Sequence, residues 1–71
     1  MVLSDAKVNT TYIFESADLP LQLSKRLEAL GMTKDCPIEV LNRKGQGILI
    51  IKIRGTRFAI GANVSKNIVV R

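Results

Sequence analysis

The side chains that carry out most protein chemistry are scarce in this sequence of 71 residues. It has no histidine, the commonest general base, and only one cysteine. Cys36 precedes Pro37 at the expected start of a strand, and no histidine is available to activate its thiol. The six acidic residues show no metal-ligand spacing, and Fe(II) sites favour imidazole together with carboxylate. The sequence therefore predicts no catalytic residue, no metal site and no cofactor.

The basic side chains are the residues whose distribution indicates a function. Residues 1–42 hold four Lys or Arg against six acids, whereas residues 43–71 hold seven Lys or Arg and no acid. Such an asymmetry is typical of a basic face that meets an acidic partner. A surface charge that only keeps the protein in solution explains it equally well.

A hairpin predicted over residues 48–60 positions three of these cations. Its strands alternate apolar and polar side chains, and a two-residue turn at Gly55-Thr56 joins them. This register places Arg54 opposite Arg57, with Lys52 on the same face. Like charges that face each other across two strands destabilise a fold, so a role in binding an acidic surface is one explanation. Side chains that splay apart without measurable repulsion are the other.

Two isoleucines add an apolar part to the same hairpin. If the residues between them point into the core, Ile48 and Ile50 point outward beside Lys52. A short helical turn predicted at residues 61–66 either covers them or leaves an apolar patch for a partner or a second copy. The candidate partner-binding residues are therefore Ile48, Ile50, Lys52, Arg54 and Arg57.

A helix with a sharp end is predicted before the hairpin. Leucines at 19, 23, 27 and 30 recur at helical spacing and form one apolar stripe. Gly31 suits the left-handed backbone that ends a helix, and Met32 can fold back onto Leu27 in a Schellman close. Tyr12 and Phe14 are expected to face inward from a strand. The predicted strands span residues 10–16, 36–42, 48–54, 57–60 and 67–70.

These elements predict a small β-barrel with one inserted helix, because closing a sheet removes edges that a small domain cannot cover. The length allows a single domain over residues 1–71. No apolar run approaches the roughly 18 residues of a membrane-spanning helix. The N-terminal residues lack the layout of a signal peptide, and the lone cysteine fits a reducing, cytosolic compartment.

The order and spacing of these segments resemble the FeoA family, small cytoplasmic proteins associated with bacterial ferrous-iron uptake. The resemblance implies a barrel of the Src-homology-3 type, and a role beside a membrane iron transporter that carries a cytosolic GTPase domain. Where the family usually has Pro-Gly, this chain has Val8-Asn9 and Lys34-Asp35. Asn and Asp tolerate left-handed backbone best among non-glycine residues, so both turns are expected to survive. The matching segments are Leu3-Ser4-Asp5, Arg26-Leu27, Leu30-Gly31-Met32, Ile38, Val40, Gly47, Gly55, Ala59-Ile60 and Ile68-Val69-Val70.

Two functions of different classes follow. The resemblance implies a cytosolic adaptor that binds and modulates the cytosolic part of a ferrous-iron transporter, without enzymatic activity, as a monomer or with weak self-association. The alternative is a small basic barrel that binds nucleic acid, as a pI near 9.9 suggests. Proteins that bind single-stranded nucleic acid interleave aromatic and basic residues on their surface, whereas Tyr12, Phe14 and Phe58 are expected in the core of this chain. Nucleic acid retained on purification would favour this alternative.

Overall fold

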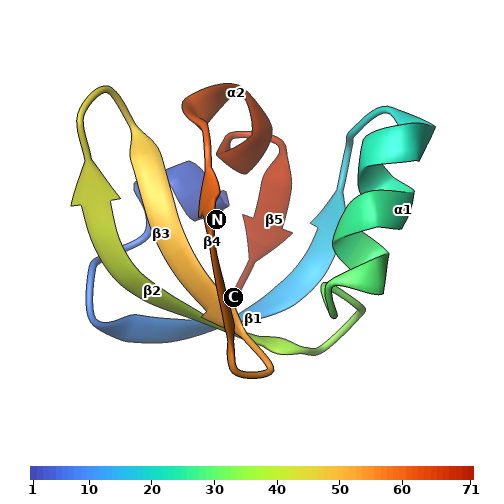
Figure 1. Cartoon of the computed structure of the whole chain (residues 1–71), viewed down its shortest axis with the longest axis horizontal. Coiled ribbons are helices and arrows are strands. Elements are labelled where there is room, and N and C mark those ends of the chain that lie inside the picture. The colour runs from blue at the N-terminus through green and yellow to red at the C-terminus, as the bar shows by residue number, and fades with distance from the viewer.

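A strongly bent, five-stranded antiparallel sheet forms the body of the protein, and one helix stands beside it (Figure 1). The computed structural model describes residues 1–71. The strand order is β4-β3-β2-β1-β5. The predicted all-β fold with an inserted helix is confirmed, and strand bounds differ from the predicted ones by two residues or fewer. In chain order the elements are η1 (Leu3–Asp5), β1 (Thr10–Ala17), α1 (Leu21–Ala29), β2 (Pro37–Lys44), β3 (Ile48–Ile53), β4 (Thr56–Ile60), α2 (Ala62–Ser65) and β5 (Ile68–Val70).

Strand β1 bends the sheet toward closure because it pairs with two different strands. Residues 10–13 pair with β2, and the second half of β1 pairs with β5. A register shift between Phe14 and Ser16 marks the change, and a second shift bends β2 against β3. Bulges of this kind turn a strand and increase its twist. The N-terminus extends the β5 side, since the Val70 N–H donates to the Met1 carbonyl at 2.8 Å.

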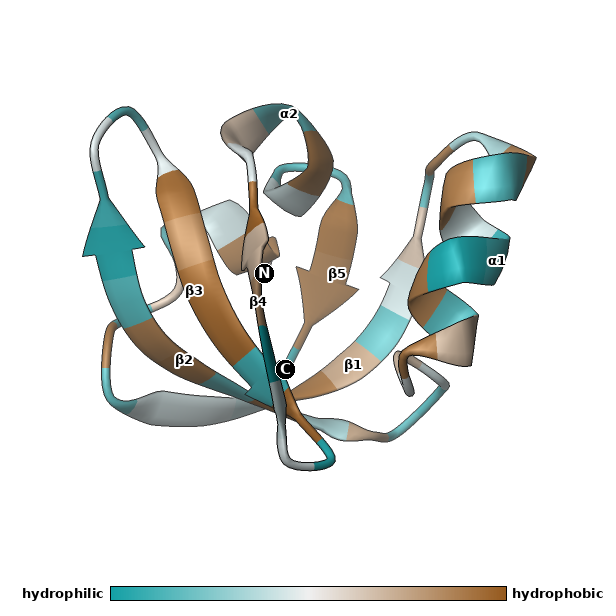
Figure 2. Cartoon of the chain, in the orientation of Figure 1, coloured by the Kyte–Doolittle hydropathy of each residue, from teal (hydrophilic) through white to brown (hydrophobic).

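The alternation along the strands places one face of each strand inside the barrel. Thirteen hydrophobic residues form the core, and three of the six residues of β3 are buried in it. Tyr12 and Phe14 are half-buried against this core, which agrees with their predicted inward direction. Figure 2 shows β3 and β5 as hydrophobic strands, whereas the end of β2 is hydrophilic. Neither helix has the length or hydrophobicity needed to span a bilayer.

Helix α1 ends in the predicted Schellman motif. The Met32 N–H donates to the Leu27 carbonyl and the Gly31 N–H donates to the Glu28 carbonyl, both at 2.9 Å. Gly31 has a φ of +108°, and Leu27 and Met32 are both buried. The predicted apolar stripe is wrong at Leu30, which is 39% exposed, and at Leu19, which precedes the helix. Leu30 is the C-cap residue, where the chain turns away from the line of the stripe.

The two turns that lack the family's glycine keep left-handed backbone, as expected. Asn9 has a φ of +63° and Asp35 a φ of +67°. Both residues form backbone hydrogen bonds with the sheet. The Asn9 N–H donates to the Val40 carbonyl at 2.7 Å, and the Asp35 N–H donates to the Phe14 carbonyl at 2.9 Å. The replacements therefore leave the turn geometry intact.

Candidate partner-binding face

Four of the five predicted site residues lie on the outer side of the sheet formed by β2, β3 and β4. The outward residues of β3 alternate with its three buried ones. Across the ladders, Lys44 of β2 lies opposite Ile48, and Arg57 of β4 lies opposite Lys52. The pairing of β2 with β3 adds Glu39, Asn42 and Lys44 to this surface, which the sequence pattern alone did not place there. We call it the basic–apolar face: Glu39, Asn42, Lys44, Ile48, Ile50, Lys52, Arg57 and Ala59.

The apolar part of this face is open at one end. Ile48 is 42% exposed, and Ile50 is half-buried beside the exposed Ala59. The short helix α2 does not cover Ile48. It packs instead at the β2–β3 turn, where a Cβ placed on Gly47 would lie 3.0 Å from the Cβ of Ala62. Of the two possibilities for Ile48, the structure shows the uncovered one.

The predicted hairpin turn is wrong by one residue. The turn is formed by Arg54 and Gly55, with φ of +51° and +82°, as a type I′ turn requires. Arg54 therefore does not oppose Arg57, whose partner is Lys52. The observed register pairs the whole of β4 with β3 and brings Leu49 opposite Ile60. The predicted register would leave Leu49 without a partner in β4.

Arg54 leaves the outer face and extends over the end of α1. A Cβ placed on Gly31 would lie 3.0 Å from Arg54 Cδ and 3.2 Å from Ile53 Cγ2. The stem of Arg54 thus packs against the backbone that closes the helix. It also borders a shallow polar hollow that includes Glu39 and Lys52. The fifth predicted residue therefore lies at the rim of the basic–apolar face and not on it.

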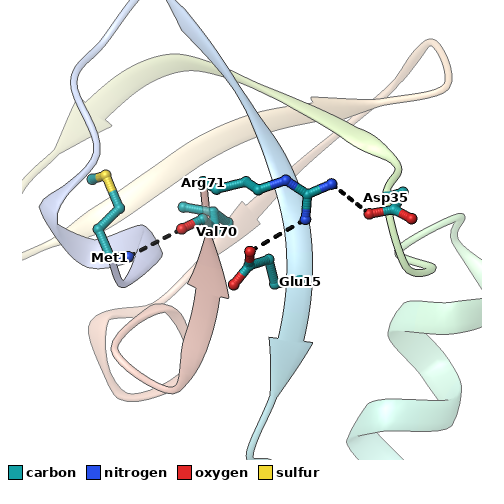
Figure 3. Close-up of polar contacts among 5 residues, drawn as sticks. All are labelled: Met1, Glu15, Asp35, Val70 and Arg71. Atoms are coloured by element: carbon teal, nitrogen blue, oxygen red, sulfur yellow. Dashed lines mark hydrogen bonds and ion pairs between the residues drawn. The ribbon is translucent and has the colours of Figure 1, made fainter.

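Two of the seven C-terminal cations, although exposed, are engaged in contacts with other parts of the chain. Arg71 bridges Asp35 at 2.6 Å and Glu15 at 3.2 Å (Figure 3). Hydrogen bonds to Asp35 first, and then to Glu15, raise the pKa of Arg71 above its ordinary value. Arg43 donates to the carbonyls of Ser4 and Ala6, at 3.1 Å and 2.7 Å, which ties β2 to η1.

The remaining cations of this half form no ion pair, since both ion pairs of the molecule belong to Arg71. Glu39 lies opposite Lys52 from the β2 side but does not reach ion-pair distance. Lys52 and Arg57 face each other with no carboxylate between them. The predicted concentration of positive charge on this hairpin is therefore present, with Lys52 in the place predicted for Arg54.

The acidic residues and the cysteine lie apart from one another. No group of three or more His, Cys, Asp or Glu side chains comes together. Cys36 is 5% exposed and belongs to the hydrophobic core. No buried side-chain nitrogen or oxygen lacks a hydrogen-bond partner.

A groove of about 310 Å³ lies between β1 and α1, away from the basic–apolar face. Phe14 and Leu19 contribute apolar walls, and Ser24, Glu28 and Lys34 contribute polar ones. None of the predicted site residues borders it. It is a second surface against which the role of the first can be compared.

Comparisons with known proteins agree with this fold. An NMR structure of the FeoA protein from Chlorobium tepidum has a TM-score of 0.93 over all of this chain and 69% of that chain. Its identity is 22%, so this likeness concerns the fold. A crystal structure of Stenotrophomonas maltophilia FeoA in complex with zinc has a TM-score of 0.84 and 29% identity, over all of this chain and 89% of that one. That protein is described as a prokaryotic SH3 domain protein and a candidate activating factor for ferrous iron transport.

A further crystal structure, of an iron uptake regulatory protein (FeoA), has a TM-score of 0.82 and 30% identity over 97% of this chain and 90% of that one. No curated protein matches the sequence. The expected Src-homology-3-like architecture is thus confirmed by the solved structures. Because the model of the FeoA domain matches residues 1–71, the chain belongs to the FeoA family.

Proposed function

We propose that this chain is a cytosolic regulatory adaptor of ferrous-iron uptake. It binds the cytosolic part of a ferrous-iron transporter, which carries a GTPase domain, and modulates it without chemistry of its own. Membership of the FeoA family supports the link to ferrous iron. The description of the Stenotrophomonas relative as a candidate activating factor supports regulation as the role. The adaptor acts as a monomer or with weak self-association.

The basic–apolar face is the observation that carries this proposal. Ile48 and Ile50 form its apolar strip, with Lys44 at one end and Lys52 beside Arg57 at the other. An apolar centre bounded by polar and charged groups is the usual anatomy of a protein interface. An aromatic surface for stacking bases is missing here, because Phe58 is half-buried against the core.

The two parts of the face have separate physical roles. Burial of Ile48, which is 42% exposed in the free protein, supplies hydrophobic free energy on binding. Lys52 and Arg57 attract an acidic surface, accelerate the encounter and fix its orientation. Because exposed charges are screened by salt, the association is expected to weaken as ionic strength rises.

Charge reversal tests whether this face binds the isolated cytosolic domain of the transporter. Lys52→Glu with Arg57→Glu is expected to weaken binding by at least about tenfold, roughly 1.4 kcal/mol. Lys7→Glu with Lys25→Glu is the matched control, since it changes the net charge equally at two exposed residues that belong neither to the basic–apolar face nor to the groove. The control variant should bind nearly as tightly as wild type. Isothermal calorimetry at low and high salt measures both, with thermal melts to verify folding.

Two outcomes would contradict the proposal. If the two double variants lose equal affinity, the chain responds to net charge and not to this face. If neither loses affinity while both remain folded, the interface lies elsewhere, and the groove between β1 and α1 becomes the surface to test. Nucleic acid that copurifies with wild type and not with the Lys52 and Arg57 variant would instead favour a nucleic-acid-binding barrel.

A further inference from the structure

Strand β4 is an edge of the sheet with a free side. In the strand order β4-β3-β2-β1-β5, its only neighbour is β3. The β3–β4 ladder runs without a bulge from Thr56 to Ile60. Figure 1 shows β4 as a straight strand between the hairpin turn and α2. An edge of this kind exposes a row of hydrogen-bonding groups that another strand can pair with.

The geometry of the hairpin identifies which groups are free. In an antiparallel hairpin closed by a two-residue turn, the residues that flank the turn form a hydrogen-bonded pair, and such pairs alternate along the ladder. Thr56, Phe58 and Ile60 therefore bond to β3, whereas Arg57 and Ala59 direct their N–H and C=O groups away from it. No backbone hydrogen bond outside the ladders involves residues 56–60. Two donors and two acceptors thus stand unpaired by the protein along this edge.

The side chains along the edge favour an acidic occupant. Arg57 and Ala59 are both exposed, and Lys52 lies directly across from Arg57. Edge strands are usually protected by proline, a bulge or a charged residue, and here the protection is a cation alone. That cation repels a second copy of the same basic strand but attracts a strand that carries carboxylates. Charge complementarity therefore selects an extended acidic segment over self-pairing.

We propose that the free edge of β4 receives an extended acidic segment of the partner as an additional strand. Backbone hydrogen bonds form at Arg57 and Ala59, and carboxylates of the segment lie beside Arg57 and Lys52. Main-chain pairing supplies affinity in such strand additions, and alternate side chains supply specificity. The identity of the partner rests on the function proposed above, whereas the binding mode can be tested without it.

Synthetic peptides test the binding mode on the wild-type protein. The probe is a capped heptapeptide that alternates glutamate and valine. One comparison peptide has lysine for glutamate, and another has every backbone amide methylated. The glutamate peptide is expected to slow hydrogen exchange at the Arg57 and Ala59 amides by at least about tenfold. Equal binding of the methylated peptide would overturn the proposal, because that peptide cannot donate backbone hydrogen bonds.

A pair of variants at one position tests the same edge from the side of the protein. Ala59→Pro removes a free N–H, and proline is tolerated on an edge where the N–H faces solvent. Ala59→Val is the matched control, since it keeps the N–H and favours a strand. The proline variant should bind the glutamate peptide at least about tenfold more weakly, and the valine variant should bind it nearly as wild type does. Equal binding by both variants would overturn the proposal. If the proline variant fails to fold, the methylated peptide decides.

Titration of the same variants with the transporter domain separates this inference from the proposed function. Loss of binding with Ala59→Pro and not with Ala59→Val supports both. If both Ala59 variants bind the transporter domain equally and the Lys52 and Arg57 double variant does not bind it, the adaptor function stands and the proposed strand addition at β4 is overturned. If the glutamate peptide pairs with β4 but the transporter domain does not bind at all, the strand addition at β4 stands and the adaptor function is overturned. The wild-type protein could also form a dimer that Ala59→Pro dissociates and that the glutamate peptide leaves intact. In that case a second copy of the chain occupies the edge, and the proposal of an acidic segment is overturned.

Discussion

Replacing Gly31 by alanine tests how tightly the end of α1 is fitted to the hairpin. The φ of +108° at this position lies outside the regions that residues with a side chain adopt. A Cβ there would lie 3.0 Å from Arg54 Cδ and 3.2 Å from Ile53 Cγ2. Arg54 Cδ belongs to a flexible side chain and can move. Ile53 is fully buried and cannot move without disturbing the core.

The expected cost is large for a domain of this size. Holding a residue with a side chain in sparsely populated backbone costs about 1–3 kcal/mol. Crowding a well-packed core costs about another 1–3 kcal/mol. A free energy of unfolding of about 4–10 kcal/mol is typical of 71 residues. Gly31→Ala, at roughly 4 kcal/mol, is therefore expected to remove on the order of half of the stability.

Urea unfolding followed by circular dichroism measures this effect. Gly45→Ala is the matched control, because its φ is +51° and nothing lies within 4 Å of the new Cβ. It should cost only about 1–2 kcal/mol. Adding Arg54→Ala to Gly31→Ala should recover less than about 1 kcal/mol, since the backbone strain and the Ile53 contact remain. Equal unfolding midpoints for the two glycine variants would refute the reasoning.

Two further predictions concern the turn and the metal. Arg54→Asn should raise the free energy of unfolding by about 1 kcal/mol, because Asn tolerates the φ of +51° and Asn-Gly suits a type I′ turn; a lower urea midpoint would show that the packing of Arg54 on Gly31 outweighs the strain. Anaerobic calorimetry should find no stoichiometric Fe(II) site tighter than about micromolar, because the chain lacks histidine and its acids are dispersed. Tighter binding would mean that these carboxylates assemble into a site in solution.

Features that depend on nearby residues could be predicted from the sequence. The Schellman close needs only a leucine, a glycine and an apolar residue at fixed spacing, and Leu27, Gly31 and Met32 supply them. Left-handed backbone at Asn9 and Asp35 follows from residue type alone. The burial of alternate residues in β3 follows from its period of two.

The hairpin turn could not be predicted with the same certainty, for a physical reason. Moving the turn from Gly55-Thr56 to Arg54-Gly55 shifts the pairing by two residues. A shift of two keeps every side chain on its own face, so the hydrophobic pattern fits both registers. What separates them is the pairing of Leu49 with Ile60, which depends on where β4 ends. The face was therefore predictable, and the partner of Arg57 was not.

The roles of Arg43 and Arg71 depend on contacts between distant parts of the chain. Arg43 binds carbonyls 37 and 39 residues away, and the partners of Arg71 lie 36 and 56 residues away. No local pattern marks such residues, and charge counting assigns them to the basic surface. Both side chains stay exposed, but because they are engaged in contacts with the chain, three of the five other cations of this half lie in the hairpin.

Three features that folding alone does not favour occur together in this hairpin. Arg54 adopts left-handed backbone, Lys52 lies directly opposite Arg57, and the edge of β4 is free. Asn at the turn and an acid at the ladder position would each suit folding better, and such stabilising replacements are readily found in natural proteins. A chain that satisfies local rules elsewhere, as at its helix end and its other turns, is expected to break them where it binds. The coincidence of all three within residues 52–60, beside the uncovered Ile48, is therefore the strongest reason to look for the partner at this hairpin first.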